Sequence, residues 1–262
     1  MEFIGASGRT FIEKFASFTG RRVTDLIDDV ETYNKDFYAY GNEVYAKLET
    51  RVAHWANFLD QGWFARRMDY PLIVASQFDV VIDLGFSVPY AFTVPQLRDS
   101  MSGKFLFVDR ESSTLDFYNT LVNLEGWTRH DLPAEVLIAD IEKEDGLDLL
   151  SKALHSTGAK SVLIVGSEVL EHLDDSAQVM RWLSHLCRPN ADLYCSYYLT
   201  LPIGAKIPSH AIEFSSSTKA TEWVKQYLPN HTAFTLAPAS LDSAHPQSSY
   251  SLYCALGNNK QN

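Results

Sequence analysis

Acidic side chains in this sequence repeatedly follow short apolar runs, at the places where strands of a sheet would end. Asp83 and then Gly85 follow the run at residues 80–82, and Asp109 ends the run at residues 105–108. Ligands of open α/β sheets bind beyond the carboxyl ends of the strands, where a glycine lets the backbone approach the ligand closely. A carboxylate at the end of the next strand can accept hydrogen bonds from both hydroxyls of a ribose. This spacing predicts a nucleoside-binding site.

Bulky residues occupy the turn after Gly85, namely Phe86, Ser87, Val88 and Pro89. The sequence lacks the G-x-G-x-x-G pattern there, and side chains of this size are poorly suited to holding a pyrophosphate on bare backbone amides. A nucleoside without phosphates is therefore the favoured ligand. A single glycine after an apolar run is also common at an ordinary strand-to-loop junction, so the turn alone leaves both interpretations open.

A third apolar run, at residues 136–139, is followed by Asp140 and Ile141. We expect the Asp140 carboxylate to accept a hydrogen bond from an adenine amino group, with Ile141 beside the ring. A fourth run, at residues 161–166, continues directly into Ser-Glu-Val-Leu-Glu-His at residues 167–172. Within this segment, Glu171 and His172 also fit the solvated start of a helix.

The elements that position these residues follow from hydrophobic periodicity. Continuous apolar runs are typical of parallel strands that helices cover on both faces. A fifth strand is expected at residues 191–198, and the runs at 232–237 and 249–255 have the spacing of an antiparallel hairpin at the sheet edge. Residues 24–63 contain almost no glycine or proline and repeat apolar residues at helical spacing, which predicts two or three helices.

From residue 78 to the C-terminus the chain resembles the class I S-adenosylmethionine-dependent methyltransferases. In that family the first strand ends in Asp/Glu-x-Gly, the second in an acid, and the fourth often in a Glu-Val-Leu-Glu-His segment. The resemblance implies an α/β Rossmann-like fold, with a mostly parallel seven-stranded sheet, an antiparallel C-terminal strand and an N-terminal helical lid. It divides the chain into a lid at residues 1–75 and an S-adenosylmethionine-binding domain at residues 76–262.

The resemblance also implies roles for single residues. The methionine part of the donor would lie against the first-strand turn, its ribose against the acid of the second strand, and its adenine against the residues after the third. Ser87 and Pro89 stand where the family usually has small residues, which leaves open how the methionine part is held. The implied donor-binding residues are Asp83, Gly85, Ser87, Asp109, Asp140, Ile141 and Glu168.

His210 is the first candidate for a catalytic acid or base, and Glu168, near donor or acceptor, is the second. In related small-molecule methyltransferases, a loop like the proline- and glycine-punctuated one at residues 201–214 helps to shape the acceptor pocket. An imidazole there could exchange a proton near neutral pH, although a histidine fixed by backbone hydrogen bonds explains the residue equally well.

Aromatic residues in the predicted lid and the fifth strand are candidates for the acceptor pocket. Ordinary core packing is the alternative for each of them. The candidates are Tyr33, Phe37, Tyr38 and Tyr198.

The formal net charge of −11, with 33 acidic and 22 basic residues, disfavours a nucleic-acid partner. Three cysteines without C-x-x-C spacing favour a reducing cytoplasm over disulfides or structural zinc, and dispersed histidines predict no metal. The N-terminus lacks the pattern of a secretion signal, and the most apolar window, residues 71–90, is interrupted by polar residues, so no membrane partner is expected. A small molecule is the expected partner, and a homodimer stays open.

These patterns leave three functional hypotheses. The first is methyl transfer from S-adenosylmethionine to a small natural-product or amino-acid-like acceptor. The second is intramolecular cyclisation of the donor with release of methylthioadenosine, as in azetidine-2-carboxylate synthases of methyltransferase fold. The third is a non-catalytic nucleoside-binding or scaffold protein, which the joint presence of Asp83, Gly85, Asp109 and Asp140 disfavours.

Overall fold

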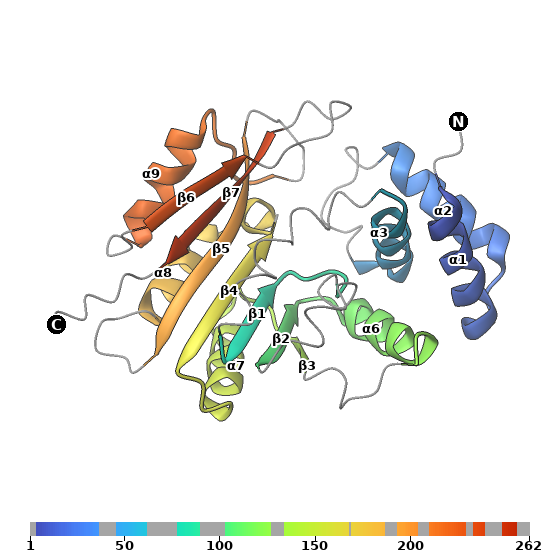
Figure 1. The fold of residues 1–262 in the computed structure, drawn as a ribbon, viewed down its shortest axis with the longest axis horizontal. Helices are drawn as coiled ribbons and strands as arrows, with labels where there is room; N and C mark the ends of the chain where they lie inside the picture. The colour runs from blue at the N-terminus through green and yellow to red at the C-terminus, as the bar shows by residue number, and fades with distance from the viewer. Residues whose placement is uncertain are drawn as a thin grey trace.

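The computed structural model describes residues 4–36, 46–61, 78–89, 103–126, 134–167, 169–186, 193–203, 210–228, 233–238 and 248–255 (Figure 1). Its strands are β1 (Val80–Leu84), β2 (Lys104–Asp109), β3 (Ala134–Ile138), β4 (Ser161–Ser167), β5 (Tyr194–Ile203), β6 (Ala233–Pro238) and β7 (Ser248–Ala255). Its helices are α1 (Ala6–Thr19), α2 (Val23–Asp36), α3 (Leu48–Gln61), α6 (Ser112–Leu124), α7 (Glu144–Ser156), the 3₁₀ helix η4 (Leu170–His172), α8 (Ser176–Leu186) and α9 (Ser217–Tyr227).

The described strands form one seven-stranded sheet in the order β3-β2-β1-β4-β5-β7-β6. The first five strands in that order pair in parallel, which confirms the predicted α/β class. Strand β7 pairs antiparallel with both β5 and β6. Because the parallel strands run in one direction, the residues that follow β1, β2, β3 and β4 all lie at the same edge of the sheet.

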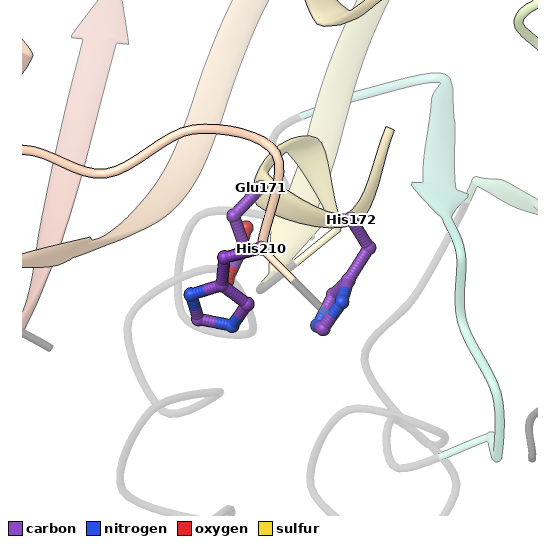
Figure 2. Close-up of side chains that lie close together, drawn as sticks. All are labelled: Glu171, His172 and His210. Atoms are coloured by element: carbon purple, nitrogen blue, oxygen red, sulfur yellow. The ribbon is translucent and has the colours of Figure 1, made fainter. Parts of the chain in front are cut away.

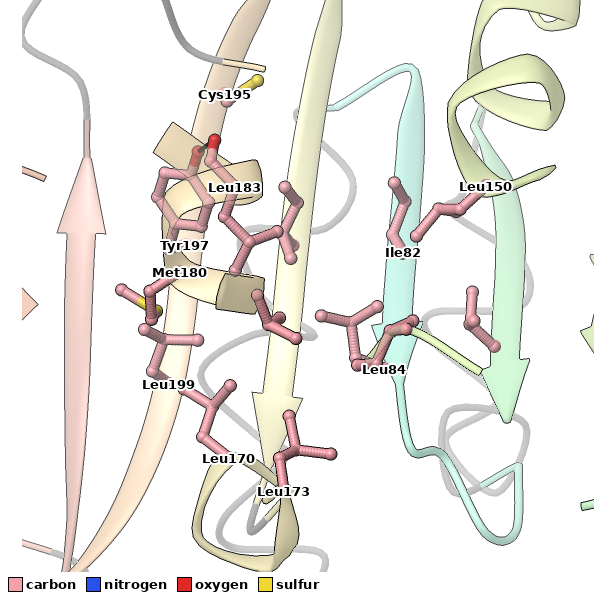
Figure 3. Packing of buried hydrophobic residues seen from close by; sticks show 14 of the residues in the cluster. Ile82, Leu84, Leu150, Leu170, Leu173, Met180, Leu183, Cys195, Tyr197 and Leu199 are labelled. Atoms are coloured by element: carbon pink, nitrogen blue, oxygen red, sulfur yellow. Dashed lines mark hydrogen bonds between the residues drawn. The ribbon is translucent and has the colours of Figure 1, made fainter. Parts of the chain in front are cut away.

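Two apolar layers cover the faces of the sheet, as continuous apolar strands require. Residues of α7, α8 and α9 pack with Val80, Ile82 and Leu84 on one face, and Figure 3 shows part of this layer. In it, the Tyr197 hydroxyl donates a hydrogen bond of 2.8 Å to the Leu183 carbonyl. Helices α1, α2, α3 and α6 belong to the layer on the other face.

The N-terminal helices reach the sheet through α6. Phe11 of α1 and Trp55 of α3 both make edge contacts with Phe117 of α6, at ring centroid distances of 6.4 and 6.3 Å. The same apolar cluster continues to Phe105 and Phe107 of β2. Burial of this much aromatic surface is a major source of packing energy, so these helices share one core with the sheet face they cover. No helix in the described part of the chain is long and apolar enough to cross a membrane.

Candidate functional site

The turn after β1 has the backbone conformation that its glycine predicted. Gly85 has a φ of 60°, in the left-handed region that favours glycine, and its N–H donates a 2.7 Å hydrogen bond to the Val108 carbonyl of β2. A Cβ atom at Gly85 would lie 2.4 Å from Cγ2 of Val169. The residues before η4 therefore pack directly against the β1 turn, and no side chain larger than hydrogen fits between them.

Ser87 continues this turn with a φ of 51°, a conformation that is uncommon for a residue with a side chain. Its backbone N–H donates to Oδ2 of Asp109 at 3.3 Å. The Glu111 N–H donates to Oδ1 of the same carboxylate at 2.9 Å. Asp109 thus ends β2 at the position predicted for the acid that binds a ribose, with backbone amides fixing its orientation.

An arginine side chain of helix α3 forms an ion pair with this carboxylate. Nη2 of Arg51 lies 3.7 Å from Oδ1 of Asp109, and the two side chains are only 1% and 8% exposed. Nη1 of Arg51 also donates a 2.8 Å hydrogen bond to the Ser87 hydroxyl. Arg51 was not identified from the sequence as a candidate site residue. A basic residue next to the apolar helix positions Val52 and Trp55 could have indicated a buried arginine with a functional partner.

His54, one turn further along α3, completes this polar group. Its Nδ1 lies 2.7 Å from the Ser87 hydroxyl oxygen, and its Nε2 is hydrogen-bonded to the hydroxyl of Tyr33. Burial, together with the nearby charges of Arg51 and His172, lowers the pKa of His54 to about 3. The imidazole is therefore neutral at physiological pH. Tyr33, predicted to line a pocket, is buried in this polar group.

Asp83 is a second buried carboxyl group at this edge, 5% exposed and near the end of strand β1, two residues before Gly85. Burial, together with the negative charge of Asp109, raises its pKa to about 8. Asp83 therefore carries a proton at neutral pH. A neutral carboxyl group can donate one hydrogen bond and accept others. Asp83 can therefore bind a hydrogen-bond acceptor, which an ionised carboxylate cannot do.

Asp140 and Ile141 follow β3 at the same edge. Partial burial acts to raise the pKa of Asp140, but hydrogen bonds from Lys143 and the Glu142 amide outweigh it and lower the pKa. Nζ of Lys143 lies 2.9 Å from Oδ2 of Asp140, and Ile141 is 6% exposed. The structure thus places a carboxylate and an apolar side chain together, as an adenine site would need.

Beyond the end of β4, Glu171, His172 and His210 come together (Figure 2). A potential ligand atom of each lies within 4.8 Å of those of the other two. The two imidazole rings have centroids 4.8 Å apart at an interplanar angle of 84°. The Ala211 N–H donates a 2.7 Å hydrogen bond to the Glu171 carbonyl, which fixes the His210 segment against η4.

This cluster changes two expectations from the sequence. Glu171 is 1% exposed, so it is not part of a solvated helix start. The histidines looked dispersed along the chain, yet the fold brings His172 of η4 beside His210, which follows β5. Two imidazoles and a carboxylate are common ligands of divalent transition metals. The expectation of no metal rested on sequence spacing, which does not report this proximity.

Four candidates remain. Glu168, Phe37 and Tyr38 lie outside the described residues. Tyr198 is 3% exposed and belongs to the apolar layer of α1, α2, α3 and α6. Arg51, Ser87, His54 and Tyr33 form one hydrogen-bonded group, which lies next to the Glu171 cluster. The charge of His172 contributes to the pKa shift of His54, and Val169, just before η4, lies against Gly85. One edge of the sheet therefore carries both halves of the candidate site.

No protein-family model and no curated protein sequence matches this chain. Among solved structures, the methyltransferase domain of bacterial CtHen1 superposes with a TM-score of 0.51 at 12% identity, over 74% of this chain and 100% of that domain. A protein from Thermobifida fusca, provisionally assigned as a methyltransferase, gives a TM-score of 0.51 at 10% identity over 94% of each chain.

Two further matches are much longer than this protein. The chain spans 42% of the length of EvdMO1 and 41% of its match in the Pnkp1/Rnl/Hen1 RNA repair complex, with a TM-score of 0.47 for each. The likeness to the two methyltransferase structures above agrees with the strand order, the antiparallel β7 and the acid-ended strands. This chain has the fold of the class I S-adenosylmethionine-dependent methyltransferases.

Proposed function

We propose that this protein transfers the methyl group of S-adenosylmethionine to a hydroxyl oxygen of a small acceptor, with the help of a divalent cation held by Glu171, His172 and His210. The observation that carries the proposal is the convergence of these three side chains at the sheet edge where the candidate donor-binding residues lie. A natural product or an amino-acid-like molecule is the acceptor class we favour.

The donor half of the proposal uses the carboxyl groups at the strand ends. Asp109 would accept hydrogen bonds from the ribose hydroxyls, and Asp140 from the adenine amino group, with Ile141 against the ring. Gly85 and the protonated Asp83 would face the methionine part. The short distance that separates the Gly85 backbone from Val169 supports this, since it brings the β1 turn beside the segment that leads to the cation cluster.

The cation supplies the chemistry that a hydroxyl acceptor needs. A hydroxyl is a weak nucleophile at neutral pH, and a divalent cation held by Glu171, His172 and His210 would make the acceptor hydroxyl more acidic, so that its proton could pass to water. The acceptor oxygen would then form a bond to the methyl carbon while the carbon–sulfur bond breaks, and the sulfonium would leave as a neutral thioether.

Charge supports a small acceptor. The formal net charge of −11 disfavours binding of a polyanionic acceptor, because neutralisation of phosphate groups requires clustered basic residues. We therefore expect the acceptor to be a neutral or cationic molecule that presents one or more hydroxyls to the cation.

Metal binding is tested first without any activity assay. The protein is stripped with a chelator and titrated with Mn²⁺, Co²⁺ and Zn²⁺ by calorimetry, with bound Mn²⁺ also counted by electron paramagnetic resonance. We expect one strong site per chain and a loss of affinity of about 100-fold in His172→Ala and His210→Ala, given that even indirect ligand partners contribute 10- to 100-fold. His155→Ala, at an exposed position of α7, is the matched control.

The reaction is tested by incubating the metal-loaded protein with S-adenosylmethionine, with and without a panel of small hydroxylated acceptors. S-adenosylhomocysteine formed only with an acceptor supports methyl transfer. Methylthioadenosine formed without one would instead establish donor cyclisation, and an unreacted donor in every case would favour a binding protein. Absence of a strong cation site in the unmodified protein would overturn the metal-assisted mechanism.

A further inference from the structure

The candidate ribose acid is not accessible in this structure. Asp109 is 8% exposed, and Arg51 of α3, itself 1% exposed, lies against its Oδ1 oxygen at 3.7 Å. A buried guanidinium is costly unless it is paired and hydrogen-bonded, so this contact anchors α3 over the end of β2.

We propose that α3 closes the donor site in the absence of ligand, with the Arg51 guanidinium held where the ribose hydroxyls of the donor would bind. This inference rests on the proposed donor site at Asp109. The nucleoside and Arg51 then compete for one carboxylate, and donor binding requires α3 to move away from the β1 and β2 ends.

The contacts of Asp109 show which side of the carboxylate the ribose and Arg51 would share. Its Oδ1 accepts from the Glu111 amide and faces Arg51, while its Oδ2 accepts from the Ser87 amide. A carboxylate has about four acceptor positions. Two ribose hydroxyls would take the positions that remain after the backbone amides, and they would therefore approach the Oδ1 side that faces Arg51.

The closing contact is wider than a single ion pair. Arg51 donates to the Ser87 hydroxyl at 2.8 Å, His54 lies 2.7 Å from the same oxygen, and Tyr33 of α2 is hydrogen-bonded to His54. Ser87 is held at a φ of 51° by these contacts and by Asp109. The same helices thus hold both the ribose acid and the β1 turn, so one movement would release both.

Two measurements with S-adenosylhomocysteine test whether the ligand and Arg51 compete for Asp109. The first is hydrogen exchange of the unmodified protein: ligand should increase exchange of the α3 amides at residues 48–61, while α7, on the other face of the sheet, serves as the internal control. The second is the calorimetric affinity of Arg51→Met, which should exceed that of the unmodified protein by about tenfold because the competitor is gone.

The matched control is Arg21→Gln. It breaks the exposed Arg21–Glu49 ion pair, which also attaches to α3 but lies away from the carboxylates, and it should change the affinity less than about twofold. Slower α3 exchange with ligand, or weaker binding by Arg51→Met, would overturn the proposal, since α3 and Arg51 would then not compete with the ligand.

The outcomes separate this inference from the donor site on which it rests. If neither the unmodified protein nor Arg51→Met binds S-adenosylhomocysteine, the donor site itself is wrong. If both bind equally and α3 exchange is unchanged, the donor site stands and the closing role of α3 is refuted. The exchange measurement on the unmodified protein is decisive alone if Arg51→Met fails to fold.

Discussion

At the scale of single residues, the site is defined by ionisable groups whose burial sets their charge. Asp83 keeps a proton at neutral pH because burial and the Asp109 charge raise its pKa to about 8. His54 stays neutral because burial, Arg51 and His172 lower its pKa to about 3. The buried edge therefore holds Arg51 and Asp109 as its charged pair, with Asp83 and His54 as neutral hydrogen-bonding partners.

The pKa of Asp83 predicts a particular dependence of stability on pH. The folded protein keeps a proton that the unfolded chain releases near pH 4, so the stabilising contribution is full below that pH and is lost as pH rises through about 8. The variant Asp83→Asn has no carboxyl group to titrate, so it does not lose stability in this way as pH rises. Its free energy of unfolding, relative to the unmodified protein, should rise between pH 5 and 9, by at most about 1.4 kcal/mol per pH unit.

Urea unfolding of both proteins across that pH range measures the effect. Asp79→Asn is the control, because backbone amides of Lys160 and Ser161 lower the pKa of Asp79, so it is ionised throughout that range in either state. Its difference from the unmodified protein should be flat above pH 5. A flat profile for Asp83→Asn as well would show that Asp83 is ionised in the folded protein.

At the scale of secondary-structure elements, the site depends on turns and helices meeting at one edge. The β1 turn touches the segment before η4 through Gly85 and Val169, and α3 touches the end of β2 through Arg51 and Asp109. Each contact joins elements that are far apart in the sequence. Packing between elements, rather than local propensity, therefore holds these side chains in place.

Gly85→Ala tests the first contact. The left-handed backbone at φ 60° costs about 1–2 kcal/mol for a residue with a side chain, and the new Cβ atom would meet Val169 at 2.4 Å. Gly20→Ala is the matched control, since Gly20 has a φ of 71° with no atom within 4 Å of the added Cβ. In chemical denaturation, Gly85→Ala should be the more destabilised, by about 1–3 kcal/mol.

Adding Val169→Ala to Gly85→Ala should recover part of that difference, because it removes the atoms that the new methyl group meets. Equal destabilisation of the two glycine variants would mean that the β1 turn does not pack tightly against Val169 in solution.

Asp109→Asn tests the second contact. It leaves the Arg51 guanidinium buried without its carboxylate, which typically destabilises a protein by about 3–5 kcal/mol. Glu49→Gln, in the exposed pair with Arg21, is the comparison and should cost at most about 1 kcal/mol. Urea unfolding measures both. A small effect at Asp109 would show that Arg51 finds water or another partner easily, and that α3 is not anchored there.

At the scale of the whole molecule, the two halves of the site should stabilise the fold independently. A ligand at 100 times its dissociation constant stabilises the folded state by about 2.7 kcal/mol, which corresponds to a rise in melting temperature of roughly 5–10 °C for a chain of this size. We expect such a rise with S-adenosylhomocysteine and a separate one with Mn²⁺.

The two rises should depend on different residues. Asp109→Asn should lose the nucleoside effect and keep the Mn²⁺ effect, whereas His210→Ala should do the reverse. Differential scanning fluorimetry on chelator-treated protein measures all four combinations. Loss of both effects in both variants would indicate one shared site instead of two adjacent ones.

The sequence by itself determined the sheet class and the edge at which the candidate donor residues lie. Continuous apolar runs specify buried parallel strands, and an acid or glycine directly after such a run must lie at the carboxyl edge, so Asp83, Gly85 and Asp109 could be placed from local pattern alone. The likeness to methyltransferase structures confirms the fold that these motifs implied.

Only the tertiary structure decided the partners of those residues. Nothing in the local sequence relates Arg51 to Asp109 or His172 to His210, because these pairs are formed by elements that meet only after the sheet is assembled. The same is true of charge: Asp83 and His54 have ordinary pKa values in the unfolded chain, and the desolvation that makes both neutral exists only in the packed core.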